Sequence, residues 1–336
     1  MTRVAIMGSG SWGTAFGMVL ADAGSDVVIW GRDPEVARGI NTDHLNEAYH
    51  PDIELPERIT ATTHADEALR GSSLVVLAVP AQVLRDNLGG WGRDVEPDAV
   101  LVSLMKGIEL GTTKRMSEVI AEAAGAGPER IAVVSGPNLA REIAQRQPAA
   151  TTVACADQGS AQRLQDACTT DYFRPYWTTD VIGTEIGGAV KNVIALANGI
   201  AVGMGMGENS QASLITRGLA EMARLGVALG ADPLTFQGLA GVGDLMATCS
   251  SPLSRNRTFG VNLGRGLSVE ETIAVTKQTC EGYKSCQPIL DLARLHGVEM
   301  PITEQVVEVV HHGRPPRMMV AAFMSRGTKA ESRLAD

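Results

Sequence analysis

Aromatic residues and positive charge are both scarce in this chain. Aromatic side chains make up 4% of its 336 residues, and 29 lysines and arginines face 38 aspartates and glutamates, so the formal net charge is −9. Nucleic-acid-binding proteins need a basic surface, and single-strand binders add aromatic stacking platforms. The composition therefore argues against nucleic acid as a partner and requires that any anion site be local.

Cysteine usage excludes two further classes. The five cysteines form no CxxC pair and, being odd in number, no even disulfide framework, which favours free thiols in a reducing cytoplasm. The sequence holds no HExxH motif and no cysteine-rich ligand set, and His311-His312 lacks the i, i+4 spacing of a shared metal face. No metal is expected.

One apolar stretch, residues 186–206, has about the length that a bilayer requires. It contains five glycines, two asparagines and Lys191, so a buried helix of a soluble protein is expected rather than a membrane span. The chain starts directly on a strand-like segment at Val4, so no signal peptide is expected.

The first half of the chain alternates β-branched apolar runs with helical segments. Strands are expected at 4–6, 27–30, 74–79, 100–104, 131–134 and 151–154, with helices such as 14–23 and 112–124 between them. Continuous apolar runs are typical of parallel strands covered on both faces. The pattern predicts an α/β doubly wound sheet.

The second half has apolar residues at helical spacing and no convincing strands. Helices are expected at 186–202, 211–230, 269–276, 285–297 and 302–311. We therefore expect an N-terminal domain at 1–183 and an all-helical domain at 184–336, joined without a proline-rich or serine-rich linker.

A glycine motif marks the start of the N-terminal domain. Gly8-Ser9-Gly10-Ser11-Trp12-Gly13 follows an expected strand and opens an expected helix, which is the context that distinguishes a dinucleotide loop from a chance GxGxxG. The first glycine makes the tight turn, the second admits the pyrophosphate and the third lets helix and strand pack closely. The motif predicts a Rossmann domain.

The second expected strand ends at Arg32-Asp33, where an acidic residue would hold the ribose hydroxyl of NAD. Here a basic residue comes first. Arg32 suits the additional phosphate of NADP, so NADPH is favoured, with NADH as the alternative through Asp33. The alternative is that Arg32 and Asp33 form a solvent-exposed ion pair on a turn and bind no cofactor.

Lys191 is the only cation in a long run of small and apolar residues. On a helix it shares a stripe with Thr184 and Asn198, and the small residues beside this stripe are expected to let a ligand approach. A buried ammonium is costly unless paired. Asp244, in the glycine-rich segment 241–245, is the candidate partner. Two alternatives stay open: Asp244 could simply stabilise a turn, and the Lys191 side chain could extend to solvent.

Three further segments carry polar groups suited to an anionic ligand. Ser254-Arg255-Asn256-Arg257 is a phosphate-sized set of donors, unless it is a solvated basic turn. Lys106 ends the strand expected at 100–104, and Gly136-Pro137-Asn138 follows the next strand. Ligands of open α/β sheets gather at such carboxyl ends.

Taken together, the segments resemble NAD(P)-dependent glycerol-3-phosphate dehydrogenases of the bacterial type along essentially the whole chain. The resemblance rests on the order and spacing of the segments 8–15, 106–109, 135–140, 190–192, 241–245 and 254–257.

The resemblance implies the reversible reduction of dihydroxyacetone phosphate to sn-glycerol 3-phosphate by hydride from the nicotinamide, which supplies glycerophospholipid synthesis. It implies that Lys191 is the general acid and base, with Asp244 and Lys106 organising the site. The implied substrate contacts are Lys106, Gly136, Asn138, Lys191, Asp244, Ser254, Arg255 and Asn256. Besides the loop glycines Gly8, Gly10 and Gly13, the implied cofactor contacts are Ser11, Trp12, Arg32, Tyr49, Lys106, Ala140, Arg255, Thr279 and Glu281.

Two other functions stay open from the sequence. A β-hydroxyacid dehydrogenase would similarly join a Rossmann domain to helices and use a helix lysine, although the Asp244 segment and the Ser254–Arg257 donors favour glycerol phosphate. A non-catalytic dinucleotide sensor would have no use for a buried Lys191. A homodimer is compatible with this class of enzyme.

Overall fold

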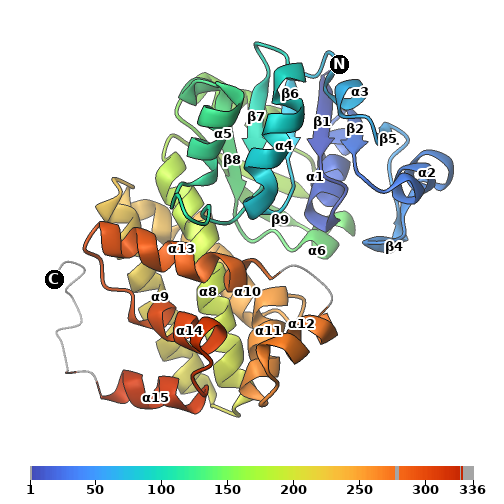
Figure 1. The fold of residues 1–336 in the computed structure, drawn as a ribbon. Coiled ribbons are helices and arrows are strands. Elements are labelled where there is room, and N and C mark those ends of the chain that lie inside the picture. Colours follow the sequence, from blue (N-terminus) through green and yellow to red (C-terminus); the bar gives the residue numbers. More distant parts are fainter. Residues whose placement is uncertain (1, 277–279, 326, 328–336) are drawn as a thin grey trace. The chain divides into compact units, whose positions relative to one another are not determined.

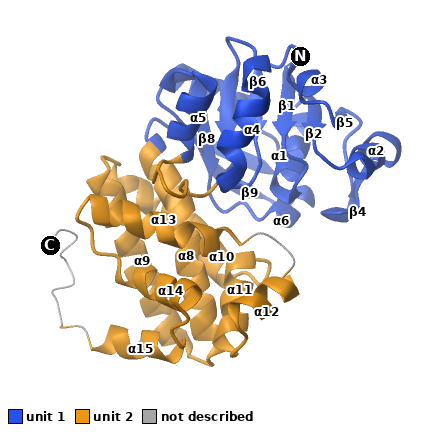
Figure 2. Ribbon diagram, viewed as in Figure 1, with its two compact units in different colours: residues 1–105, 116–181 blue, residues 106–115, 182–336 orange. Residues whose placement is uncertain are grey.

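The structure is a computed structural model that describes residues 2–276, 280–325 and 327. The chain divides into two compact units (Figure 2). Unit 1 comprises Met1–Met105 and Met116–Val181, and unit 2 comprises Lys106–Arg115 and Ile182–Asp336. The chain therefore enters unit 2 briefly after residue 105 before it returns to complete unit 1.

Unit 1 is built on an eight-stranded sheet with the order β10-β9-β8-β7-β6-β1-β2-β5 (Figure 1). Its strands are β1 (Arg3–Met7), β2 (Asp26–Trp30), β5 (Ile59–Thr62), β6 (Leu74–Leu77), β7 (Val100–Ser103), β8 (Ile131–Ser135), β9 (Ala149–Cys155) and β10 (Phe173–Thr178). A separate hairpin pairs β3 (Leu45–Asn46) with β4 (His50–Glu54). The expected doubly wound Rossmann architecture is confirmed.

Both faces of the sheet are covered by helices. These are α1 (Ser11–Asp22), α2 (Pro34–Asp43), α3 (Ala65–Leu69), α4 (Leu84–Trp91), α5 (Met116–Ala124), α6 (Ala140–Ala144) and α7 (Gln158–Ala167). Successive side chains of a strand point to opposite faces. Val4 and Ile6 accordingly join one buried cluster with Phe16 of α1, while Ala5 and Met7 join another. This two-sided burial explains why the strands read as continuous apolar runs.

Two sequence predictions about unit 1 were wrong in detail. The strand expected at 151–154 exists as β9 but runs antiparallel to β8. Apolar runs report burial on both faces and carry no information on strand direction. The helix expected at 112–124 begins only at Met116, because Ile108 forms an antiparallel bridge with Arg115 and Thr113 has a positive φ of 57°. The strands β5 and β10 were not expected.

Among the described residues of unit 2, the regular secondary structure is helical, apart from the isolated bridge at Ile108. Its helices are α8 (Val181–Gly203), α9 (Glu208–Ala228), α10 (Asp244–Ser250), α11 (Arg255–Gly264), α12 (Val269–Thr276), α13 (Glu281–Leu295), α14 (Pro301–His312) and α15 (Arg317–Met324). The helical C-terminal half is thus confirmed. The short helices α10 and α11 were not expected, because too few turns are present for a periodic pattern.

Helix α8 is the centre of unit 2. It is the one helix among the described residues that is long and apolar enough to cross a membrane, and 89% of its most apolar window is buried within the protein. A core helix accounts for this burial.

Two glycines of α8, Gly187 and Gly199, admit neighbouring segments of the same chain, and at Gly187 this corrects the expectation of space for a ligand. A Cβ on Gly187 would strike the carbonyl oxygen of Ala240, and one on Gly199 would strike that of Arg257. Gly260 of α11 likewise faces the carbonyl of Leu196. These close approaches bring α11 and the segment 239–243, which leads directly into α10, against α8.

Candidate active site

The turn between β1 and α1 requires glycine for packing at two positions. Gly8 has a φ of +133°, and a Cβ there would lie 2.6 Å from the carbonyl oxygen of Ala78. A Cβ on Gly13 would collide with the carbonyl of Gly8, whereas one on Gly10 would meet nothing within 4 Å. The turn is therefore closed by packing on one side and accessible at Gly10.

Helix α1 begins without a side-chain cap. Its N-cap residue is Gly10, so no side chain of that residue accepts from the first-turn N–H groups of Ser11, Trp12 and Gly13. Such N–H groups and the positive end of the helix dipole favour a phosphate. Because β1 lies between β6 and β2, the turn also stands at the switch point of the sheet, where dinucleotides bind. The residues present therefore fit a dinucleotide.

Two buried polar side chains of the β3–β4 hairpin hold this turn, and neither was predicted from the sequence. Asn46 Nδ2 donates to the carbonyl oxygen of Ser9 at 3.0 Å. His50 Nε2 lies 3.0 Å from the carbonyl oxygen of Ser11. Burial lowers the pKa of His50, which favours the neutral ring. The only feature of the sequence that could have indicated this role is the presence of two polar residues, Asn46 and His50, in a short, irregular segment.

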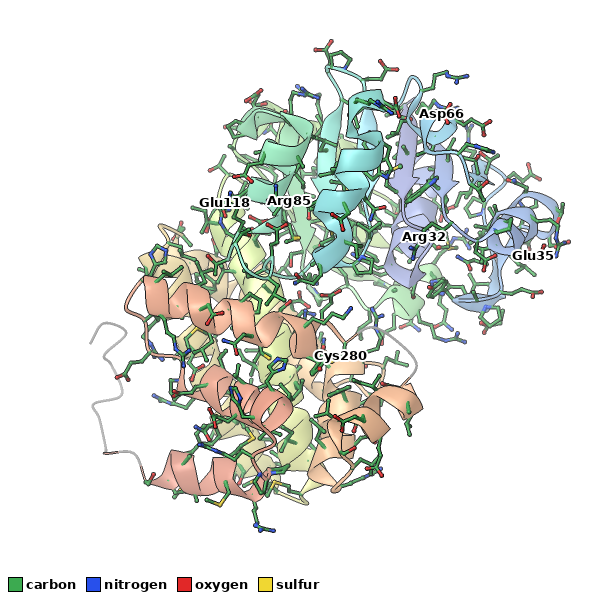
Figure 3. All side chains as sticks on the ribbon, in the orientation of Figure 1. Arg32, Glu35, Asp66, Arg85, Glu118 and Cys280 are labelled. Carbon is green, nitrogen blue, oxygen red and sulfur yellow. The ribbon has the colours of Figure 1, made fainter. Side chains whose placement is uncertain are left out.

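The residues after β2 lie beside the glycine turn. A Cβ on Gly31 would collide with the side chain of Ser9. Arg32 is exposed (Figure 3), whereas the Asp33 carboxylate accepts from the N–H of Glu35 at 2.9 Å and caps α2. Tyr49 is 43% exposed. Arg32 is thus available to a ligand, while Asp33 already has a local structural role.

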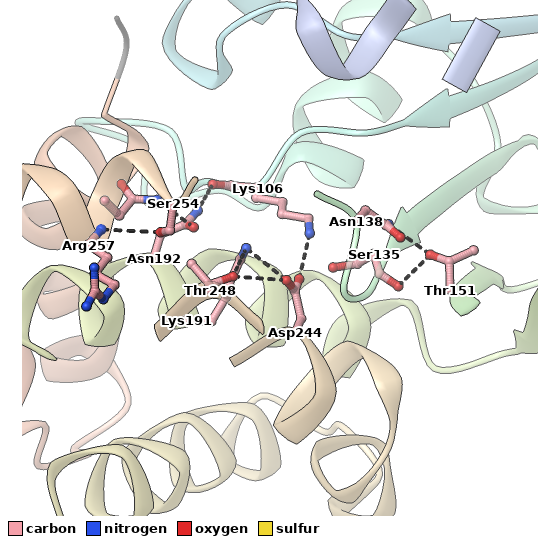
Figure 4. A network of polar contacts seen from close by, with 11 residues as sticks. Lys106, Ser135, Asn138, Thr151, Lys191, Asn192, Asp244, Thr248, Ser254 and Arg257 are labelled. Carbon is pink, nitrogen blue, oxygen red and sulfur yellow. Dashed lines mark hydrogen bonds and ion pairs between the residues drawn. The ribbon is translucent and has the colours of Figure 1, made fainter. Parts of the chain in front are cut away.

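Another group of candidates follows β8 of unit 1. Gly136 has a φ of +154°, and a Cβ there would lie 3.1 Å from the Cα of Thr151. Asn138 Nδ2 donates to Thr151 Oγ1 at 2.9 Å (Figure 4), while its Oδ1 is buried and has no hydrogen-bond partner among the described residues. Ala140 is the first residue of α6. The Asn138 amide is therefore oriented by Thr151 and retains an unused acceptor.

In unit 2, Asp244 bridges two lysines (Figure 4). Lys106 Nζ lies 2.6 Å from Asp244 Oδ2, and Lys191 Nζ lies 2.9 Å from Asp244 Oδ1. Lys191 also donates to Thr248 Oγ1 at 2.7 Å. The side chain of Asp244 is 2% exposed, that of Lys191 9% and that of Lys106 13%. The three charged residues were predicted from the sequence, whereas Thr248, one turn after Asp244 on α10, was not.

Burial and charge act in opposite directions in this cluster. Burial lowers the pKa of Lys106 to about 8, although the Asp244 carboxylate opposes the fall and Lys191 adds to it. Burial would raise the pKa of Asp244, but the two ammonium groups outweigh it and hold that pKa below its usual range. The cluster therefore places two lysine amines around one carboxylate whose ionised form is favoured, an arrangement that suits a site that stabilises an anion.

The segment that carries Lys106 is fixed to α8. Arg115 Nη1 lies 2.7 Å from Glu185 Oε2, and this ion pair is largely buried. Asn192 Nδ2 donates to the carbonyl oxygen of Lys106 at 3.3 Å, and Ile108 belongs to the apolar core of unit 2. These contacts explain why a residue that follows a strand of unit 1 belongs to unit 2.

The predicted donor set occupies the N-terminus of α11. Ser254 is the N-cap and accepts from the N–H of Arg257 at 3.3 Å. Arg255 is exposed, and Asn256 Nδ2 donates to Asn192 Oδ1 at 2.9 Å. A helix N-terminus with an arginine in its first turn and a buried amide is suited to a phosphate.

Two cofactor candidates lie at the start of α13 or just before it. Glu281 is the first residue of α13. Thr279 lies outside the described residues.

Comparisons with known proteins give a consistent result. The family models for the N-terminal and C-terminal parts of NAD-dependent glycerol-3-phosphate dehydrogenase match residues 3–161 and 180–321. A glycerol-3-phosphate dehydrogenase (NAD(P)+) from Streptomyces griseus is 65% identical over 331 residues, covering 98% of each chain. The corresponding protein from Thermobifida fusca is 63% identical over 98% of this chain and 99% of its own.

A solved structure agrees. The crystal structure of glycerol-3-phosphate dehydrogenase from Coxiella burnetii superposes with a TM-score of 0.91 at 35% identity, over 96% of this chain and 98% of that one. The resemblance inferred from the sequence is confirmed.

Proposed function

This chain belongs to the NAD-dependent glycerol-3-phosphate dehydrogenase family, and from that premise we propose how its residues carry out the reaction. The enzyme is an oxidoreductase that uses a nicotinamide cofactor to reduce dihydroxyacetone phosphate reversibly to sn-glycerol 3-phosphate. The observation that carries the proposal is the buried cluster of Lys106, Lys191 and Asp244.

Lys191 acts as the general acid. Hydride addition to a ketone, the chemistry that the bound nicotinamide supplies, builds negative charge on the carbonyl oxygen. An ammonium beside that oxygen stabilises the charge and donates the proton, and the neutral amine accepts it in reverse. Thr248 and Asp244 hold Lys191 Nζ through contacts of 2.7 and 2.9 Å, so the amine is oriented before substrate arrives.

The substrate phosphate binds at the N-terminus of α11. Ser254, Arg255 and Asn256 provide the hydrogen-bond donors and the positive charge, and Lys106 adds a second cation. Binding energy from this non-reacting phosphate holds the ketone in position for reaction. Gly136 and Asn138 of unit 1 contribute further substrate contacts.

Unit 1 takes the cofactor. The turn of Gly8, Gly10 and Gly13 and the N-terminus of α1 would hold the pyrophosphate, and the other cofactor candidates would supply the remaining contacts. These are Ser11, Trp12, Arg32, Tyr49, Lys106, Ala140, Arg255, Thr279 and Glu281. Most of these cofactor candidates belong to the expected cofactor domain, 1–183, but Arg255, Thr279 and Glu281 belong to the expected substrate domain, 184–336, and Lys106 belongs to the segment Lys106–Arg115 of unit 2.

The direct test follows nicotinamide absorbance when purified protein meets dihydroxyacetone phosphate, with NADPH and NADH in parallel. Rapid oxidation of the cofactor is expected. A panel of β-hydroxyacids and their ketones serves as control. Turnover of that panel in place of dihydroxyacetone phosphate would favour a hydroxyacid dehydrogenase, and cofactor binding without any turnover would favour a dinucleotide sensor.

NADPH is the preferred cofactor because Arg32 is exposed beside the turn while Asp33 is engaged as a helix cap. Arg32→Ala is expected to raise the KM for NADPH about tenfold, since a charge-assisted phosphate contact is lost, and to change the KM for NADH by less than about twofold. Steady-state kinetics with both cofactors provide the measurement.

Arg38→Ala is the matched control for Arg32→Ala. Arg38 is an exposed arginine of α2 that pairs with Glu35, and its removal should leave both KM values unchanged. Equal weakening of NADPH and NADH in Arg32→Ala would remove the proposed phosphate contact.

The enzyme acts in the cytoplasm, as a homodimer, and supplies the glycerol phosphate backbone of phospholipids. The five cysteines are buried free thiols, in keeping with a reducing compartment. Light scattering of the purified protein tests the dimer, since a monomeric mass would contradict it.

A further inference from the structure

The side-chain amide of Asn256 lies in a chain of hydrogen bonds with a fixed direction. Its Oδ1 accepts from the N–H of Gly282 at 2.8 Å and from the Cys280 thiol at 3.0 Å. Its Nδ2 donates to Asn192 Oδ1 at 2.9 Å, and Asn192 Nδ2 donates to the carbonyl oxygen of Lys106 at 3.3 Å.

Both ends of this chain are backbone groups of fixed polarity. The N–H of Gly282 can only donate, and the carbonyl of Lys106 can only accept. An amide flip at Asn256 would place its NH2 group against the N–H of Gly282, with two donors facing each other. The two ends therefore determine the orientation of both asparagine amides, which are otherwise free to flip.

The first turn of α13 is packed tightly enough to hold this geometry. A Cβ on Gly282 would lie 2.5 Å from the carbonyl oxygen of Asn192 and 3.0 Å from Asn256 Oδ1. Gly282 and Cys280 are both buried (Figure 3 labels Cys280). Glycine is thus needed for α13 to approach α8 and reach the amide oxygen.

We propose that the first turn of α13, through Cys280 and Gly282, is a positioning element that makes Asn256 present an N–H group to the substrate phosphate. The proposal rests on the proposed function for the identity of the substrate. The contacts among the described residues use one of the two Nδ2 hydrogens of Asn256. The second Nδ2 hydrogen is oriented by the same chain of hydrogen bonds and is available to a phosphate oxygen. An ionised phosphate oxygen accepts hydrogen bonds and cannot donate them.

Cys280→Ala tests the hydrogen bond from the Cys280 thiol to Asn256 Oδ1. It removes one hydrogen bond and is expected to raise the KM for dihydroxyacetone phosphate about fivefold, with kcat changed by less than about twofold. Cys280→Ser restores a donor and should return the KM to within about twofold of wild type. Cys286→Ala is the matched control, since it shortens another buried cysteine of α13 that contacts Tyr283 and His311 instead.

A double-mutant cycle separates positioning from general packing. If Cys280 acts through Asn256, then Cys280→Ala has no further effect on KM in an Asn256→Ala background. An additive effect, or equal impairment in the serine and alanine variants, would overturn the proposal.

Inorganic phosphate provides a readout that does not depend on turnover. Phosphate should protect wild type from thermal unfolding, and Cys280→Ala should need about fivefold more phosphate for equal protection. If wild type fails to reduce dihydroxyacetone phosphate but this difference persists, the proposed function fails and the positioning role stands. If turnover is normal and both proteins respond equally to phosphate, the positioning role fails alone.

Discussion

Replacing Lys191 by alanine is expected to lower kcat for reduction of dihydroxyacetone phosphate by about a thousandfold, because it removes both the proton donor and the charge that stabilises the forming alkoxide. The Lys191 side chain is 9% exposed and is held by Asp244 and Thr248, so no water takes its place with the same orientation. Stopped-flow and steady-state absorbance measurements at saturating substrate give the value directly.

The control must show that the cofactor still binds. Fluorescence titration of Lys191→Ala with NADPH should give a Kd within about twofold of wild type, since the dinucleotide turn belongs to unit 1. Lys284→Ala, a charge deletion at an exposed position of α13, should retain full activity. A Lys191→Ala variant that keeps a tenth or more of the wild-type kcat would show that another group donates the proton.

Asp244→Asn is expected to have the second largest effect, a loss of about a hundredfold in kcat/KM. The substitution leaves Lys106 and Lys191 buried without the carboxylate that lies 2.6 and 2.9 Å from them. Removing one partner of a buried ion pair costs about 3 to 5 kcal/mol, so the variant should also unfold at lower temperature.

The same substitution changes the pH dependence in a defined direction. Burial lowers the pKa of Lys106 to about 8 against the opposing effect of Asp244, so in wild type kcat/KM should fall as pH rises through about 8 and the ammonium loses its proton. Without the carboxylate this pKa falls further, and the alkaline decline should move to lower pH. Rate profiles between neutral and alkaline pH provide the measurement, with Asp291→Asn on α13 as control. An unchanged alkaline limb would contradict the coupling.

The sequence contained the charged residues of the site but little of the scaffold that orients them. Lys191 was conspicuous because an ammonium in an apolar helix requires a partner, and Asp244, a carboxylate in a glycine-rich apolar segment, was the candidate. Thr248 and Asn192 carry no charge and are ordinary residues of helices. Their roles emerge only when α11 and the segment that leads into α10 pack against α8 through close backbone approaches at Gly199 and Gly187.

Other differences also have local causes. Glycines at 187 and 199 look alike whether a ligand or a neighbouring helix fills the space beside them. The apolar residues of β9 record that both of its faces are buried but not that it runs against β8. Asp33 was considered for a ribose hydroxyl, whereas its role as the cap of α2, in which its carboxylate accepts from the N–H of Glu35, was not predicted from the sequence.

The excursion of Lys106–Arg115 into unit 2 limits how this protein can be divided. A fragment that starts at Ile182 would contain every helix of unit 2 yet lack Lys106, the Arg115 partner of Glu185 and the core residue Ile108. Dividing the chain at a single position therefore cannot give two fragments that each contain one complete unit. Exchange of the substrate module with that of another such enzyme would have to transfer two separate stretches of sequence.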